Sequence, residues 1–178
     1  RDRYREVVVV ADDFTGANDA GVSLALRGKK VCVAFQTVST EPTDALVINT
    51  ESRALGASEA AEKIARLGAD VVNARWLIKK VDSTLRGNVG AETAALQALS
   101  GKRQIVIAPA YPAAGRITRH GQCLVDGIPV NETEFASDPK TPVPSADIVD
   151  LFFGLAAKSV TVHDLDTALA QGDGVLIV

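Results

Sequence analysis

Short apolar runs alternate with segments of helical periodicity along most of the chain. Val7 to Ala11 is a continuous apolar, β-branched run, a pattern typical of a strand buried on both faces. Ala57 to Leu67 instead repeats its apolar residues at helical spacing. The predicted strands are Val7–Ala11, Lys30–Phe35, Ala45–Asn49, Trp76–Val81, Gln104–Ala108, Ser159–Val162 and Val175–Val178. The predicted helices are Gly16–Arg27, Ala57–Leu67, Asn88–Leu99, Ser145–Leu155 and Asp164–Gln171.

This alternation predicts an α/β fold with three layers, in which helices flank a doubly wound, mostly parallel sheet. Thr15 is the expected N-cap of the first helix, and Gly28 is its expected stop. The segment from Pro109 to Pro144 breaks the pattern, because it holds all but one of the chain's seven prolines and shows no helical period. We expect a long functional loop here, with a short hairpin that turns at Asp126-Gly127.

Composition narrows the classes of function. The 178 residues include 19 basic and 22 acidic side chains, so the net charge of −3 disfavours a nucleic-acid partner. No apolar run approaches the roughly 18 residues that span a bilayer, and no signal-peptide pattern is visible. We therefore expect no membrane partner and a cytoplasmic location. Cys32, Cys123 and two isolated histidines show no metal-ligand spacing, so we predict no metal site.

Two adjacent carboxylates, Asp12 and Asp13, directly follow the first predicted strand, and Thr15 lies at the start of the next helix. Free N–H groups at a helix start attract anionic ligand groups. Carboxylates at such a place accept protons from hydroxyl groups or hold hydrated Mg²⁺. The alternative is that either aspartate only caps the helix. We expect the pair to belong to a ligand site, and the sequence does not decide which of the two is the proton acceptor.

A second polar string, Lys79 to Asn88, again lies between a predicted strand and a predicted helix. A guanidinium binds a carboxylate in bidentate fashion, hydroxyls and carboxylates bond a polyol, and a glycine permits close backbone approach. The candidates for these roles are Lys80, Asp82, Ser83, Arg86 and Gly87. The alternative is a capped helix start with a surface salt bridge.

Two further segments follow predicted strands. Tyr111 and Arg116 can line the same site, although a rigid proline-rich connector explains them equally well. Glu51-Ser52-Arg53 either joins the same crevice or forms an ordinary polar turn. The sequence contains no GxxxxGK[ST], GxGxxG or GxSxG motif, so it offers no P-loop, dinucleotide fingerprint or nucleophile elbow.

Three ordered motifs together resemble the N-terminal domain of the four-carbon acid sugar kinases, a group long labelled as a domain of unknown function. They are Ala11–Asp19, Lys79–Glu92, and Ala108–Pro112 with Gly115-Arg116, and the segments Thr50–Arg53 and Glu132–Pro139 also fit. The resemblance implies ATP-dependent phosphorylation of a sugar acid such as a threonate, an erythronate or an oxo-tetronate. It further implies that the N-terminal domain holds the acid sugar, while ATP and Mg²⁺ are bound mainly by a separate C-terminal domain.

Carried onto this chain, the resemblance places the sugar-acid site at Asp12, Asp13 and the string from Lys79 to Arg86. We expect Asp13 or Asp12 to be catalytic, as the group that orients or deprotonates the reacting hydroxyl. The expected substrate-binding residues are Asp12, Asp13, Thr15, Lys80, Asp82, Ser83, Arg86, Gly87, Tyr111 and Arg116.

We expect residues 1–178 to be the acid-sugar-binding domain of a longer protein, inactive without its ATP-binding domain. Two alternatives stay open: a phosphatase-like hydrolase with an aspartyl nucleophile, and a non-catalytic sugar-acid sensor. The sequence does not decide the sugar acid, its stereochemistry, the position phosphorylated, or whether the protein is a homo-oligomer.

Overall fold

The fold is that of a computed structural model, which describes residues 5–35 and 42–178. A four-stranded parallel sheet with the strand order β2-β3-β1-β4 organises the first half of the chain. Its strands are β1 (Arg5–Ala11), β2 (Val31–Phe35), β3 (Ala45–Asn49) and β4 (Ala74–Lys80). Val9 of β1 lies opposite Val47 on one side and Ile78 on the other. This central position explains why β1 and β3 are apolar along almost their whole length.

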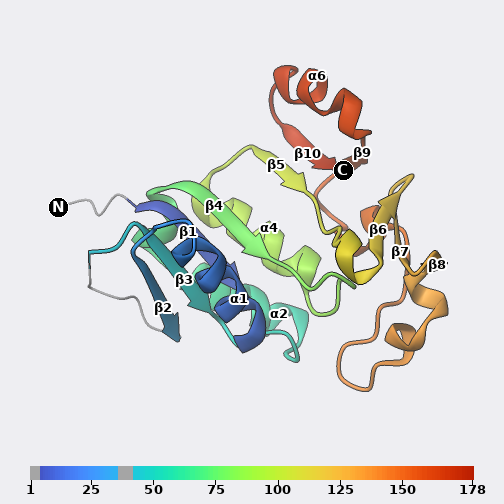
Figure 1. The fold of residues 1–178 in the computed structure, drawn as a ribbon, viewed down its shortest axis with the longest axis horizontal. Coiled ribbons are helices and arrows are strands. Elements are labelled where there is room, and N and C mark those ends of the chain that lie inside the picture. The colour runs from blue at the N-terminus through green and yellow to red at the C-terminus, as the bar shows by residue number, and fades with distance from the viewer. Residues whose placement is uncertain (1–4, 36–41) are drawn as a thin grey trace.

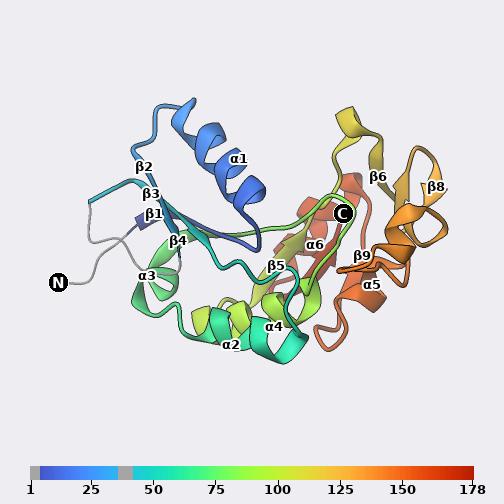
Figure 2. The ribbon, with the colours of Figure 1, turned by 90° about the horizontal axis from the view of Figure 1, so that it is seen from below.

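Helices cover both faces of this sheet (Figures 1 and 2). One face carries α1 (Phe14–Ala25), and the other carries α2 (Ala57–Ala65), α3 (Ala69–Val72) and α4 (Val89–Ser100). Successive residues of β1 therefore enter different cores. Val7 and Val9 pack on the α1 side, whereas Val8 and Val10 pack on the side of α2 and α4. The predicted three-layer arrangement is confirmed for this half of the chain.

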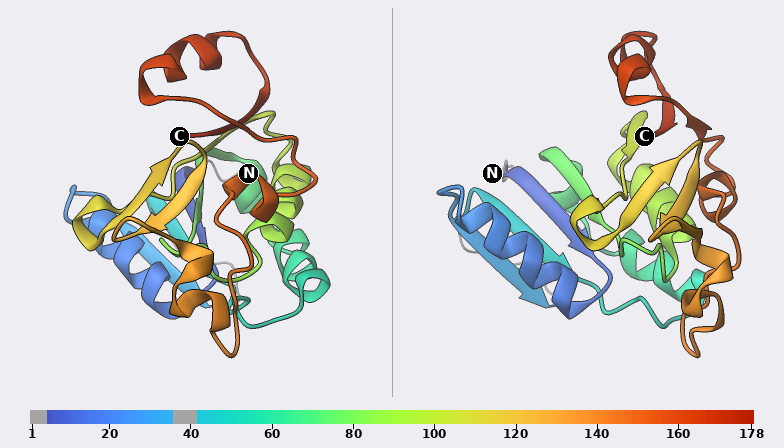
Figure 3. Two further views of the ribbon diagram at one scale, coloured as in Figure 1. Left: turned by 90° about the vertical axis from the view of Figure 1, so that its right-hand side faces the viewer. Right: turned by 45° about the vertical axis from the view of Figure 1, so that its right-hand side comes forward.

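The second half builds two small sheets and a core of its own. The parallel sheet has the order β5-β10-β9 and contains β5 (Gln104–Ile107), β9 (Lys158–Ser159) and β10 (Gly174–Ile177). The antiparallel sheet contains β6 (Arg116–Arg119), β7 (Gln122–Val125) and β8 (Ile128–Pro129). The helices are α5 (Ile148–Leu151) and α6 (Leu165–Ala170), and Figure 3 shows α6 projecting beyond the rest of the fold. Among the described residues, no helix has the length and apolar character needed to cross a membrane.

The mostly parallel α/β class is confirmed, but the parallel strands divide between two sheets instead of forming one. The segment Pro109–Pro144 is more ordered than expected, because it contains the whole antiparallel sheet rather than a loop with a single hairpin. The expected helix Ser145–Leu155 is wrong in length. Only α5 forms there, and the chain then turns through Gly154 and Ala156, both at positive φ. The short helix α3 was not predicted.

The N-cap of α1 is Asp13, and the expectation of Thr15 is wrong. Asp13 has an extended backbone (φ −142°), and its Oδ1 accepts a hydrogen bond from the Gly16 N–H at 2.8 Å. The helix therefore begins at Phe14, two residues before the predicted start. An aspartate at this position stabilises a helix by about 1 kcal/mol relative to alanine.

Candidate functional site

The carboxyl ends of several parallel strands open onto one cavity of about 850 Å³. Its walls come from the start of α1 and from the segments that follow β3, β4 and β5. The polar side chains that line it belong to Asp13, Thr15, Asp19, Ser23, Arg53, Lys80, Asp82, Ser83, Arg86 and Tyr111. Ligands of open parallel sheets bind outside the carboxyl ends of the strands, so this cavity is the candidate site.

One corner of the cavity joins Arg53 to both aspartates at the end of β1. Arg53 donates from Nε and Nη2 to the two carboxylate oxygens of Asp12, at 3.2 and 3.0 Å, and its Nη1 lies 2.9 Å from Asp13 Oδ2. The Asp12 side chain is only 2% exposed and lies behind Arg53, whereas that of Asp13 is 26% exposed and lines the cavity.

Gly87 completes this corner from the other side. Its φ of +92° is in the left-handed region, and a Cβ built there would lie 2.8 Å from Asp12 Oδ2 and 3.2 Å from Arg53 Cγ. Only a residue without a side chain lets the backbone pass this close to the buried ion pair. Gly87 therefore contributes to this corner by leaving room for the Asp12–Arg53 ion pair.

A second corner pairs Arg86 with Asp82. Arg86 donates from Nε and Nη2 to the Asp82 carboxylate at 2.8 and 3.1 Å, and the Thr84 hydroxyl donates to the same carboxylate. Burial opposes ionisation of Asp82, but the hydrogen bonds from Arg86 and Thr84 outweigh it and lower its pKa to about 2. At neutral pH Asp82 is therefore an ionised acceptor.

Arg86 also touches the proline-rich segment. Its guanidinium lies 5.5 Å from the ring centroid of Phe135, and its Nη1 lies 3.8 Å from Asp138 Oδ2. The guanidinium of Arg116 lies 5.8 Å from the same ring, so Phe135 is shared by two cations.

Lys80 is the third cation on the cavity wall. Its Nζ donates to the Val81 carbonyl at 2.9 Å, and it forms no ion pair with a carboxylate of the described residues. It lies beside the first turn of α1, since a Cβ built at Gly16 would be 3.4 Å from Lys80 Cγ and 3.9 Å from Lys80 Nζ. An ammonium next to a helix N-terminus is a favourable place for an anionic ligand group.

The structure brings most of the predicted site residues together. Those that line the cavity are Asp13, Thr15, Lys80, Asp82, Ser83, Arg86 and Tyr111. Asp12 and Gly87 lie directly behind the wall, and Arg116 lies on β6 against Phe135. Direct ligand contact by these last three stays a prediction, and their positions suit support of the wall better.

Arg53 is the residue that the sequence left undecided, and the structure places it in the cavity. It follows β3, and β3 is the direct parallel neighbour of β1. The signal that could have identified it is therefore strand adjacency, because the ends of neighbouring parallel strands meet at one edge of the sheet. Phe135 and Asp138 were not predicted either.

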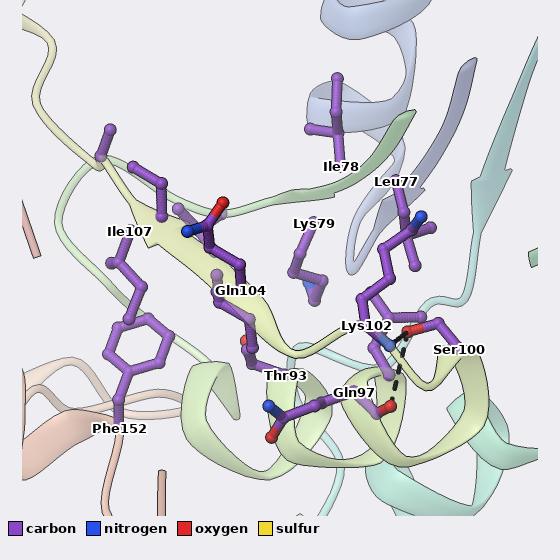
Figure 4. Close-up of a pocket in the computed structure, with 15 residues that line it drawn as sticks. Leu77, Ile78, Lys79, Thr93, Gln97, Ser100, Lys102, Gln104, Ile107 and Phe152 are labelled. Atoms are coloured by element: carbon purple, nitrogen blue, oxygen red, sulfur yellow. Dashed lines mark hydrogen bonds between the residues drawn. The ribbon is translucent and has the colours of Figure 1, made fainter. Parts of the chain in front are cut away.

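A second, smaller cavity of about 340 Å³ lies between β4, β5 and α4 (Figure 4). Its lining is largely apolar, as at Leu77, Leu96 and Ile107, and of the predicted string from Lys79 to Arg86 it contains only Lys79 and Val81. Figure 4 shows Lys79 pointing from β4 towards α4. β4 and β5, which line this space, belong to different sheets.

A family model described as a sugar-binding N-terminal domain matches residues 7–176. The chain belongs to this family of sugar-binding N-terminal domains. The sugar-binding domain is 44% identical, over 97% of its own length and 45% of the relative's, to a D-threonate kinase of Salmonella typhimurium. It is 36% identical to a D-erythronate kinase of Heliobacterium modesticaldum, over 96% of its length and 40% of the relative's. The predicted resemblance is confirmed, and the chain spans less than half the length of these relatives.

A solved structure supports the fold. The sugar-binding domain superposes with a TM-score of 0.83 on a domain of unknown function from Bordetella bronchiseptica, at 31% identity, covering 97% of this chain and 46% of that one. That protein was crystallised as a domain-swapped dimer with bound citrate.

Proposed function

We propose that this sugar-binding domain holds a four-carbon sugar acid of the threonate or erythronate type, which the full-length protein phosphorylates with ATP. The observation that carries the proposal is the convergence of Arg53, Lys80 and Arg86 with three carboxylates, those of Asp13, Asp19 and Asp82, on one cavity at the strand ends. The kinase names of the relatives support the same reaction.

The cavity matches the chemistry of such a ligand, which presents one carboxylate and several hydroxyl groups. Lys80, beside the start of α1, is the partner we assign to the carboxylate, because no described carboxylate neutralises it. Asp13, Thr15 and Ser83 offer hydrogen-bonding groups for the hydroxyls. Arg86 can contribute only in part, since Asp82 already occupies its Nε and Nη2.

Asp13 is the better placed of the two aspartates to receive the proton of the reacting hydroxyl. Its side chain lines the cavity and is 26% exposed, whereas the Asp12 side chain is 2% exposed and lies behind Arg53. The oxygens of both carboxylates are held by hydrogen bonds or ion pairs, so exposure to the cavity is what distinguishes them. Phosphoryl transfer depends mainly on positioning and charge stabilisation, together with a group that orients the nucleophile. We therefore assign Asp13 to the hydroxyl and Asp12 to holding Arg53.

Among the described residues, no group of three His, Cys, Asp or Glu side chains is arranged to hold a metal ion, and the sequence has no P-loop motif. We propose that ATP and Mg²⁺ are bound by the part of the full-length protein that this chain does not cover, since it spans 45% of the D-threonate kinase.

Two broader features follow from the proposal. An ATP-dependent kinase works where ATP is available, so we propose a cytoplasmic location, with which the free thiols Cys32 and Cys123 agree. The domain-swapped dimer of the Bordetella protein supports a homo-oligomer.

The test is steady-state kinetics of the full-length protein with ATP and a panel of four-carbon sugar acids, monitored as ADP release. We expect turnover of at least one acid. Lys80→Met should raise KM about tenfold, because it removes a charge-assisted contact. Asp13→Asn should lower kcat by about a hundredfold, the scale of a lost general base. Lys158→Met, at an exposed position, is the matched control and should change neither constant.

The alternatives give different results in the same assay. Release of phosphate from phosphorylated acids without ATP would favour the hydrolase. Tight binding of a sugar acid without ATP turnover would favour the sensor.

A further inference from the structure

Glu92 is a buried acid that neither the packing nor the proposed chemistry explains. It lies on α4 with 0% exposure, among neighbours such as Val89 and Leu96. Its Oε1 accepts a hydrogen bond from the Ser52 hydroxyl at 2.7 Å, while its buried Oε2 has no hydrogen-bond partner among the described residues. Burial raises the pKa of Glu92, and the nearby Asp12 adds to this effect, whereas Lys79 and Ser52 oppose it. Burying an ionisable acid costs free energy, so the position of Glu92 calls for an explanation in terms of the contacts that it makes.

The contacts of Glu92 lead to the turn after β3. The Ser52 Oγ lies 2.6 Å from Thr50 Oγ1, and Thr50 Oγ1 donates to the Ala11 carbonyl at 3.0 Å. The Ser52 N–H donates to the Asp12 carbonyl at 3.0 Å. The next residue is Arg53, which joins both aspartates in the cavity.

A second contact leads to the end of β4. Lys79 Nζ lies 3.8 Å from Glu92 Oε1 and donates to the Lys80 carbonyl at 3.2 Å. The Lys79 side chain is only 8% exposed, so this ion pair is screened from water. One carboxylate therefore touches both chain segments that present a cation to the cavity.

We propose that Glu92 is a positioning residue, which holds the Thr50–Arg53 turn and the end of β4 from behind so that Arg53 and Lys80 keep their places on the cavity wall. This inference rests on the proposed function for the identity of the ligand. It does not need that function for the structural link between Glu92 and the turn.

The decisive variant is Lys79→Met combined with Glu92→Leu, tested in the full-length protein. Removing both charges leaves no unpaired buried ion, so the variant should fold with wild-type circular dichroism. The turn nevertheless loses its anchor. We expect KM for the sugar acid to rise about tenfold with kcat little changed, because the loss of a hydrogen bond to a charged group weakens binding by about this factor. We also expect amide hydrogen exchange at Ser52 and Arg53 to become about tenfold faster.

The matched control is Glu62→Gln combined with Arg66→Gln, which removes an exposed ion pair from α2. It should leave KM and the exchange rates at wild-type values. If the folded Lys79/Glu92 variant has the wild-type KM and the wild-type exchange rates at Ser52 and Arg53, the proposal is overturned.

Two further measurements cover the remaining outcomes. If wild-type protein phosphorylates no four-carbon acid, the proposed function fails, and the exchange rates at Ser52 and Arg53 alone decide the role of Glu92. If the double variant does not fold, Ser52→Ala removes the same hydrogen bond and leaves both charges in place. Faster exchange at Arg53 in that variant supports the proposal, and unchanged exchange overturns it.

Discussion

The two corners of the cavity each pair an arginine with an aspartate, but they are built in different ways. Arg53 reaches Asp12 across 41 residues of sequence, and the aspartate is 2% exposed. Arg86 pairs with Asp82 only four residues away, and these side chains are 30% and 14% exposed. The first pair is part of the core, whereas the second belongs to a half-buried turn. A ligand can therefore compete for Arg86 without loss of the fold, while displacing Arg53 would leave a buried charge alone.

The largest expected effect separates the two corners directly. Arg53→Leu should destabilise the protein by about 3–5 kcal/mol, since it leaves the buried Asp12 carboxylate without its partner. Arg86→Leu should cost only about 1 kcal/mol, as expected for a more exposed i,i+4 pair. Urea denaturation measures both. Equal losses would show that the two corners do not differ as the burial indicates.

The next effect concerns pH. The folded-state pKa of Asp82 is lowered to about 2 from an ordinary 3.8, so its ionised form stabilises the fold above about pH 4. This contribution, about 2 kcal/mol at most, should disappear as the pH falls through 2. Asp82→Asn should therefore be less stable than wild type at pH 7 and converge with it near pH 2, as followed by urea denaturation. The exposed Asp166→Asn is the control, and a constant difference at all pH values would contradict the assignment.

A comparison of two glycines tests the close approach at the Arg53 corner. Gly87 and Gly28 both have positive φ, +92° and +78°, but only Gly87 faces nearby atoms. Gly28→Ala should cost about 1 kcal/mol through backbone strain alone. Gly87→Ala should cost about 1–3 kcal/mol more, because the new Cβ collides with the Asp12 carboxylate. Thermal unfolding of the two variants measures this difference. Equal melting temperatures of Gly28→Ala and Gly87→Ala would show that Gly87 does not lie against the Asp12 carboxylate.

The smallest expected effect belongs to the Arg86 corner. Phe135→Leu keeps an apolar side chain but removes the ring over which Arg86 and Arg116 lie. The expected loss is about 1 kcal/mol, the scale of exposed cation–π contacts. In a Phe135→Leu, Arg86→Leu double-mutant cycle the two losses should not add. Full additivity would show that the ring does not stabilise this guanidinium.

The sequence predicted the first half of the fold well because its strands carry their own signal. Val7 to Ala11 is apolar throughout, and such a run is stable only between two helical layers. The second half was harder, because β6 and β7 have only four residues each and depend on pairing with each other. His120 and Gly121, both at positive φ, form the two-residue turn between them, and His-Gly is not one of the dipeptides that signal a hairpin in a sequence.

The candidate site was predictable where it follows a strand end in the sequence, as at Asp13, Lys80 and Asp82. The pairings between site residues far apart in the sequence were not predictable. Arg53 could only be assigned once β3 was known to neighbour β1, and Phe135 only once the proline-rich segment was known to fold back over Arg86. Pattern along the chain reveals local elements, whereas the pairing of distant side chains depends on the strand order.

The Asp13 carboxylate has little freedom to rotate. One of its oxygens accepts from the Gly16 N–H and the other faces the Arg53 guanidinium, so folding itself fixes the plane of the group. The conformational entropy of this side chain is therefore lost when the chain folds and not when a ligand arrives. A preorganised acceptor of this kind lets more of the contact energy appear as affinity.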